Sequence, residues 1–209
     1  MSYPPVHHQE SSYENIINLM QSFPLATIIS SFEGQIQCSH TPLIFQANNS
    51  LGILVGHLDK FNPQLHHFKE QQEVELIFHG PDLYISPSIY GTTQLPTWNY
   101  FKAHLKGHVI LESDQEKVKQ SLIQMTAFLE GDQPRYSLDP DNPRMARALD
   151  YIVGFQIEIK AWEGKYKISQ DKRKDDQKRA KQAMLKTMEK KRKEAIELLY
   201  TFHQTMKPQ

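Results

Sequence analysis

Cysteine is nearly absent from this chain, which has only Cys38 among its 209 residues. A single cysteine excludes an intramolecular disulfide and a zinc site built from several thiolates. It favours a reducing, cytoplasmic setting. No Cys/His signature of a nucleophile surrounds Cys38, so we expect a buried structural thiol at this position.

Long apolar runs are missing as well. No stretch approaches the roughly 20 apolar residues that a membrane-spanning helix needs. The first ten residues, MSYPPVHHQE, lack the basic and apolar regions of a signal peptide. We therefore expect a soluble protein with no membrane partner.

The strong motifs of hydrolytic and metal chemistry are also absent. The sequence has no G-x-S-x-G elbow for a nucleophilic serine. Its ten histidines form no HExxH pattern or other strong ligand spacing. We expect neither a hydrolase nor a metal site.

The zero net charge hides two oppositely charged parts. Residues 1–170 contain 12 Lys/Arg and 18 Asp/Glu, whereas residues 171–209 contain 12 Lys/Arg and 6 Asp/Glu. In the second part, apolar residues recur at helical spacing from Ala180 to Met206. This pattern predicts a domain over residues 1–170 and a basic, helical C-terminal extension over 171–209.

The basic residues of the extension admit two interpretations. They could contact nucleic acid electrostatically, or they could form a solvated face of a protruding helix. The extension has no helix-turn-helix pairing and no interleaved aromatics. The candidate nucleic-acid residues are Lys172, Arg173, Lys174, Lys190, Lys191, Arg192 and Lys193.

Closely spaced β patterns dominate the first part. Alternating or β-branched apolar segments are typical of strands, and they occur at Leu25–Ser31, Thr41–Gln46, Glu73–Phe78, Trp98–Leu111 and Tyr151–Ile159. Hairpin spacing without βαβ alternation predicts a mainly β fold with peripheral helices, built on an antiparallel barrel.

Three helix starts accompany these strands. Ser11 and Glu14 form a capping-box pattern, and Asp114 is placed to cap a later amphipathic helix. Between them, Asn62–Pro63 predicts a short helix that extends to about Glu70.

A positive charge precedes the Asn62–Pro63 helix start. Lys60 lies two residues before Asn62, and the free N–H groups of a helix start favour an anion. These residues are consistent with a phosphate cradle. They are equally the pattern of an ordinary capped helix.

Residues 78–101 are unusually rich in aromatic residues for a segment that prolines and glycines interrupt. They hold six of the chain's 21 aromatic residues, interrupted by three prolines and two glycines. Rigid turns that carry aromatics suit a pocket wall for a planar ligand. The same aromatics could instead fill a barrel core or a dimer seam.

Taken together, these segments resemble the PaiB-type, FMN-binding negative transcriptional regulator family. The resemblance covers about residues 1–175. It depends on several motifs in the expected order: Ser39-His40-Thr41-Pro42-Leu43, Gly56-His57, Asn62-Pro63-Gln64, Ile77-Phe78-His79-Gly80-Pro81, Tyr84-Ile85-Ser86-Pro87-Ser88, Pro96-Thr97-Trp98-Asn99-Tyr100, Val153-Gly154-Phe155 and Glu163-Gly164-Lys165.

The resemblance implies an antiparallel split β-barrel, related to the pyridoxamine-phosphate-oxidase-like flavoproteins. It implies a homodimer with FMN sites at the interface and a role in negative transcriptional regulation. Position within the matching motifs gives the candidate cofactor-binding residues His40, His57, Lys60, Asn62, Ser86, Trp98, Asn99 and Tyr100. The chain departs from the family at Ile89, where an aromatic residue is expected.

Two other functions stay open at this point. Related barrels include flavin-dependent oxidoreductases that act on small molecules, and some split barrels handle haem through a histidine. Neither the motifs nor the spacing identifies an acid–base or nucleophilic catalyst. Cofactor binding is therefore a firmer expectation than any named reaction.

Overall fold

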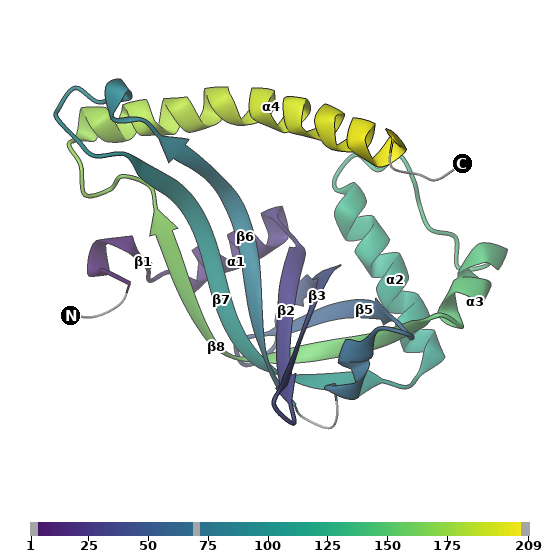
Figure 1. Ribbon diagram of the computed structural model, residues 1–209. Coiled ribbons are helices and arrows are strands. Elements are labelled where there is room, and N and C mark those ends of the chain that lie inside the picture. Colours follow the sequence, from purple (N-terminus) through teal and green to yellow (C-terminus); the bar gives the residue numbers. More distant parts are fainter. Residues whose placement is uncertain (1–3, 69–71, 206–209) are drawn as a thin grey trace. The chain divides into compact units, whose positions relative to one another are not determined.

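A computed structural model describes residues 4–68 and 72–205 (Figure 1). Two compact units share the chain. Unit 1 comprises Met1–Gln9, Pro81–Phe101 and Lys165–Gln209, and unit 2 comprises Glu10–Gly80 and Lys102–Gly164. The predicted domain boundary at residue 170 stays a prediction.

Eight strands and seven helical segments make up the described chain. The strands are β1 (Gln9–Glu10), β2 (Leu25–Phe32), β3 (Gln35–Pro42), β4 (Ile44–Gln46), β5 (Ile53–Asp59), β6 (Glu73–Ile85), β7 (Thr97–Glu112) and β8 (Ile152–Lys167). The α-helices are α1 (Tyr13–Ser22), α2 (Gln115–Glu130), α3 (Pro143–Leu149) and α4 (Lys174–Thr205), and the 3-10 segments are η1 (Val6–His8), η2 (Pro63–His66) and η3 (Pro87–Ile89).

The strands form one sheet in the order β3-β2-β6-β7-β8-β5-β4, and β1 pairs with β8. The pairings β2–β3, β2–β6, β4–β5 and β5–β8 are antiparallel. Strand alternation places Val74, Leu76 and Phe78 of β6 inside, as the pattern of Glu73–Phe78 predicted. The expectation of a mainly β, antiparallel fold is confirmed.

Unit 2 brings the two ends of this sheet together. Thr41 of β3 donates its hydroxyl to the backbone oxygen of His57 in β5, at 2.9 Å. Strands β3 and β5 are joined here through a side chain, not through a continuous ladder of backbone hydrogen bonds. The enclosed core contains large side chains that are less than 2 % exposed: Ile16, Met20, Ile28, Leu43, Leu54, Phe68, Leu76, Phe78, Leu105, Phe155 and Ile157.

Two glycines permit close approach inside unit 2. A Cβ at Gly56 would lie 2.5 Å from Leu43 Cδ2 and 2.9 Å from Phe155 Cζ. A Cβ at Gly107 would lie 2.7 Å from the backbone oxygen of Glu158. Both glycines are therefore required by packing against neighbouring strands.

The ends of several elements differ from the sequence expectations. The cap of α1 is Ser12, whose hydroxyl accepts from the backbone N–H of Asn15 at 3.4 Å, so the capping-box assignment to Ser11 was wrong by one residue. The predicted helix after Asn62 is only the four-residue segment η2. Asp114 caps α2 as expected, because its Oδ1 accepts from Glu116 and Lys117.

Strand β6 continues through Pro81, although proline lacks the N–H group of a ladder donor. The pairing of β6 with β2 ends at Phe78, so nothing in β2 requires a donor from Pro81. Pro81 therefore lies beyond the end of this pairing but within the strand, whereas Pro87, Gly91 and Pro96 lie between β6 and β7.

Unit 1 has its own small hydrophobic cluster. Leu83, Ile85 and Tyr90 pack with Ala180 and Met184 of α4. The predicted apolar stripe on the C-terminal helix is thus confirmed in its first turns. Farther along, Ala195 is exposed, and Met206 lies outside the described residues.

Candidate functional site

The eight predicted cofactor residues fall equally into the two units. Unit 2 contains His40, His57, Lys60 and Asn62, and unit 1 contains Ser86, Trp98, Asn99 and Tyr100. Each group is described within its own unit.

His40 belongs to a polar chain across three strands of unit 2. Thr27 of β2 pairs directly with His40 of β3. Its Oγ1 lies 3.0 Å from His40 Nδ1 and 3.0 Å from His79 Nε2. A hydroxyl has one hydrogen, so Thr27 donates to one imidazole and accepts from the other. Both imidazoles belong to exposed residues and could present polar atoms to a ligand.

Thr27 and His79 were not among the predicted site residues. His79 lies in the motif Ile77-Phe78-His79-Gly80-Pro81, and Thr27 lies opposite His40 in the hairpin of β2 and β3. The register of that hairpin is the signal that could have joined them.

The imidazole of His57 makes a structural contact with helix α2. Its Nε2 lies 2.6 Å from Ser121 Oγ on α2, and Ser121 in turn donates to the backbone oxygen of Val118 at 2.7 Å. Because the serine hydrogen is used, the imidazole donates from Nε2. Burial lowers the pKa of His57 to about 4, which agrees with a neutral ring.

Lys60 and Asn62 also have partners in unit 2. Lys60 Nζ donates to the backbone oxygen of Asp150 at 2.5 Å and lies 4.4 Å from the centroid of the Tyr151 ring. Asn62 accepts from the Gln64 N–H at 2.9 Å and donates to Ser39 Oγ at 2.9 Å. The helix-start donor at Gln64 is therefore satisfied internally, and the phosphate cradle stays a prediction.

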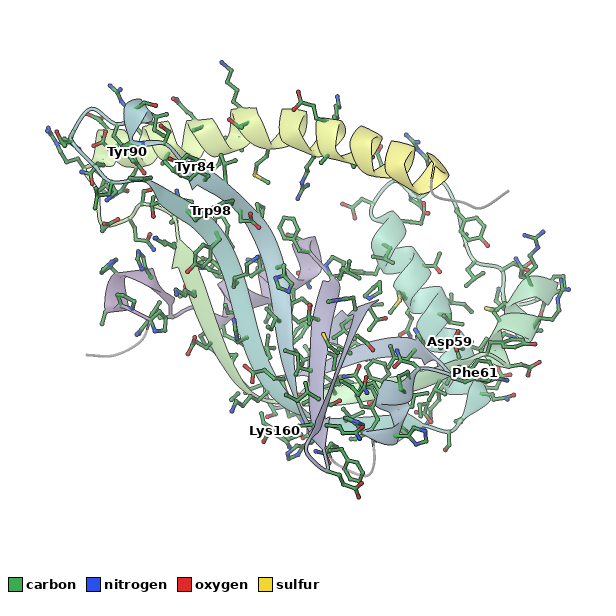
Figure 2. All side chains as sticks on the ribbon, in the orientation of Figure 1. Asp59, Phe61, Tyr84, Tyr90, Trp98 and Lys160 are labelled. Carbon is green, nitrogen blue, oxygen red and sulfur yellow. The ribbon has the colours of Figure 1, made fainter. Side chains whose placement is uncertain are left out.

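The aromatic candidates of unit 1 are accessible. Trp98 is 53 % exposed and Tyr84 is 44 % exposed. Their ring centroids lie 6.2 Å apart in an edge-to-face arrangement (Figure 2). Tyr100 carries the Lys165 ammonium 5.6 Å above its ring. Large rings left in water are suited to stacking with a planar ligand.

Ser86 and Asn99 are placed differently from these rings. Ser86 caps η3, because its Oγ accepts from the Ser88 N–H at 3.3 Å. Asn99 is only 1 % exposed, and its Oδ1 accepts from Ser169 Oγ at 3.1 Å. Its Nδ2 has no hydrogen-bond partner among the described residues.

The candidate nucleic-acid residues lie along α4 and just before it. Lys172 forms an ion pair with Asp171 at 3.2 Å, and Arg173 and Lys174 are exposed. Arg192 and Lys193 are exposed too, whereas the side chains of Lys190 and Lys191 lie outside the description. Nucleic-acid contact stays a prediction.

Other chemistry is sparse within the described ranges. No group of three or more His, Cys, Asp or Glu side chains there could hold a metal ion. Cys38 is exposed on the edge strand β3, so the expectation of a buried thiol was wrong. Across the same residues, no helix combines the length and the apolar character needed to cross a membrane.

A family model described as "Putative FMN-binding domain" matches residues 2–161. The chain is similar to the Protease synthase and sporulation protein PAI 2 of Bacillus subtilis (strain 168), with 28 % identity over 175 residues that cover 83 % of this chain and 84 % of that protein. The match to the family model ends before α4 begins at Lys174.

Two solved structures show a similar fold. The FAD and heme binding protein from Mycobacterium smegmatis aligns with a TM-score of 0.59 and 16 % identity, over 77 % of this chain and 73 % of that one. The flavocytochrome Anf3 from Azotobacter vinelandii aligns with a TM-score of 0.58 and 17 % identity, over 76 % and 69 %. The predicted split-barrel fold is confirmed.

Proposed function

Because the chain belongs to the PaiB-type family of FMN-binding domains, we propose that it binds FMN and acts as a negative transcriptional regulator. The observation that carries the proposal is the family match over residues 2–161. We further propose that the protein works as a cytoplasmic homodimer with FMN sites at the subunit interface. When bound, FMN supplies one- or two-electron redox chemistry that no amino-acid side chain offers.

The donor set of each unit fits parts of FMN. In unit 2, Lys60 offers a cation for the phosphate, while His40 offers an exposed imidazole. In unit 1, Trp98 and Tyr100 offer aromatic faces, and Ser86 offers a hydroxyl. His57 supports this set indirectly, since its bond to Ser121 holds β5 against α2.

Changing Lys60 to glutamine tests the phosphate contact. A charge-assisted hydrogen bond to phosphate is worth about 1.5 kcal/mol or more, so the variant should bind FMN about tenfold more weakly. Riboflavin lacks the phosphate, and its affinity should be unchanged. Quenching of flavin fluorescence on titration measures both affinities, and light scattering of the same samples gives the mass of the assembly.

The matched control is Lys106→Gln, which removes an exposed strand lysine that has no assigned role. It should leave both flavin affinities unchanged. Wild-type protein that quenches neither flavin would refute FMN binding. Equal losses for FMN and riboflavin in Lys60→Gln would refute the phosphate role alone.

The proposed role in transcriptional regulation is tested separately, through DNA binding. Truncating α4 would remove Ala180 and Met184 from the core cluster of unit 1, so point changes are preferable. Arg173→Gln with Arg192→Gln removes two exposed cations outside that cluster. Affinity for DNA falls as salt rises, and each lost phosphate contact should reduce the magnitude of the slope of log affinity against log salt by about 1.

A gel shift over a salt series, with promoter DNA of the host, measures that slope. Glu194→Gln on the same helix is the control and should not lower the slope. If the arginine variant keeps the wild-type slope, α4 makes no phosphate contacts at these positions.

A further inference from the structure

Unit 1 has a half-open cavity of about 540 Å³ beside α4. This volume is within the range of small-molecule sites in proteins. Phe101 and Met184 contribute apolar surface to its lining. All of its lining residues belong to unit 1.

Asn99 lines this cavity and is almost completely buried. Asn99 is 1 % exposed, and its Nδ2 has no hydrogen-bond partner among the described residues. The amide is held in place from the other side, because Ser169 Oγ lies 3.1 Å from Asn99 Oδ1 and 2.9 Å from the Tyr90 hydroxyl. A buried donor left unpaired is unfavourable, but Nδ2 has almost no accessible surface, so Asn99 forms part of the cavity wall and is not a contact for a ligand.

Three lysines indicate that the cavity suits an anion. Lys174, Lys178 and Lys181 all line the cavity, and their spacing of four and three places them on one face of α4. No described carboxylate forms an ion pair with any of the three. Like charges at this spacing repel one another, and an anion between them would relieve the repulsion.

The lysine face is held over the cavity. Asp176 accepts from the Gly91 N–H at 2.7 Å and from the Thr92 hydroxyl at 2.5 Å. One turn later, Ala180 is fully buried in the hydrophobic cluster of unit 1. The first turns of α4 are thereby fixed, so the cations are pre-positioned for a ligand.

We propose that this cavity is a second ligand site, which binds a small molecule with an apolar, aromatic body and one anionic group. The anion would meet the lysines, and the body would lie against Phe101 and Met184. The lysines lie beyond the family match, which ends at residue 161.

The experiment uses 8-anilinonaphthalene-1-sulfonate as the probe, because it joins an aromatic body to one anion. Full-length protein should bind one molecule per chain. The double variant Lys178→Gln/Lys181→Gln should bind it at least about tenfold more weakly, since two charged contacts are lost. Lys186→Gln removes an exposed lysine of the same helix that does not line the cavity, and it should bind the probe like the wild type.

Two further arms distinguish binding in this cavity from purely hydrophobic binding and from binding in the flavin site. N-phenyl-1-naphthylamine has the same rings without the sulfonate, and it should bind more weakly and without dependence on the lysines. Saturating FMN should leave probe binding intact. The proposal is overturned if the double variant binds the probe like Lys186→Gln, if the uncharged probe binds as tightly, or if FMN displaces the probe. Failure of FMN to bind at all would refute the proposed flavin function and leave the probe result standing.

Discussion

Phe155→Ala should lower the free energy of unfolding of the protein by about 3–5 kcal/mol. Phe155 is 1 % exposed in the core of unit 2, and its ring centroid lies 5.3 Å from that of Phe68 in an edge-to-face contact. The absent side chain of Gly56 makes room for this ring. Alanine would leave a cavity that rigid strands on both sides cannot fill.

Phe61→Ala is the matched control, because it makes the same substitution at a residue that is 73 % exposed. It removes only a surface contact with the Lys60 ammonium, at 5.3 Å, so it should cost less than about 1 kcal/mol. Urea unfolding followed by far-UV circular dichroism measures both variants. The total free energy of unfolding of a small protein is only about 5–15 kcal/mol. The difference in stability between the two variants should therefore be large relative to that total. Similar losses in the two variants would contradict this account of the core.

Local alternation predicted most of the strands, although the segment predicted as one strand at Thr41–Gln46 is divided between β3 and β4. In β6 the side chains of Val74, Leu76 and Phe78 are buried and those between them are more exposed, which the sequence pattern of Glu73–Phe78 already contains. The long strand predicted at Trp98–Leu111 is β7, Thr97–Glu112. These segments are predictable because one face of each strand meets the core over most of its length.

Element ends were less predictable, because they depend on contacts distant in sequence. Pro81 seemed to end a strand, yet it lies within β6 beyond the last pair with β2. Cys38 was expected to be buried, yet it lies exposed on β3, at the edge of the sheet. In each case the decisive fact is which neighbouring strand is present, and no local pattern contains it.

The same distinction holds for the candidate site, where residues were predictable from motifs and their contacts were not. Family motifs identified His40, but its connection to His79 through Thr27 depends on the register of three strands. The cavity of unit 1 joins Asn99 to lysines more than 70 positions later in the chain, where the sequence suggested either nucleic-acid contact or a solvated basic helix. Motifs name residue types, whereas the partner that satisfies each polar atom is a property of the fold.

Acid should destabilise the protein through His57, and the lost free energy should reach about 3 kcal/mol near pH 4. In the unfolded chain this imidazole takes up a proton at its ordinary pKa of 6.5, whereas burial lowers its pKa in the folded protein to about 4. Between these two values the unfolded state binds the proton and the folded state does not. The contribution of neutral His57 is therefore fully present above about pH 6.5 and is lost as the pH falls toward 4.

His57→Gln isolates this effect from the other groups that titrate in the same range. Glutamine can still donate an N–H to Ser121 Oγ, which lies 2.6 Å from the imidazole Nε2, but it cannot be protonated in this range. Urea unfolding of both proteins at intervals from about pH 7.5 to about pH 4.5 gives the two stability curves. We expect the wild-type curve to fall more steeply below pH 6.5, so that the difference between the proteins shrinks or reverses in acid. Parallel curves would mean that His57 has the same pKa in the folded and unfolded states, so that burial does not favour the neutral ring.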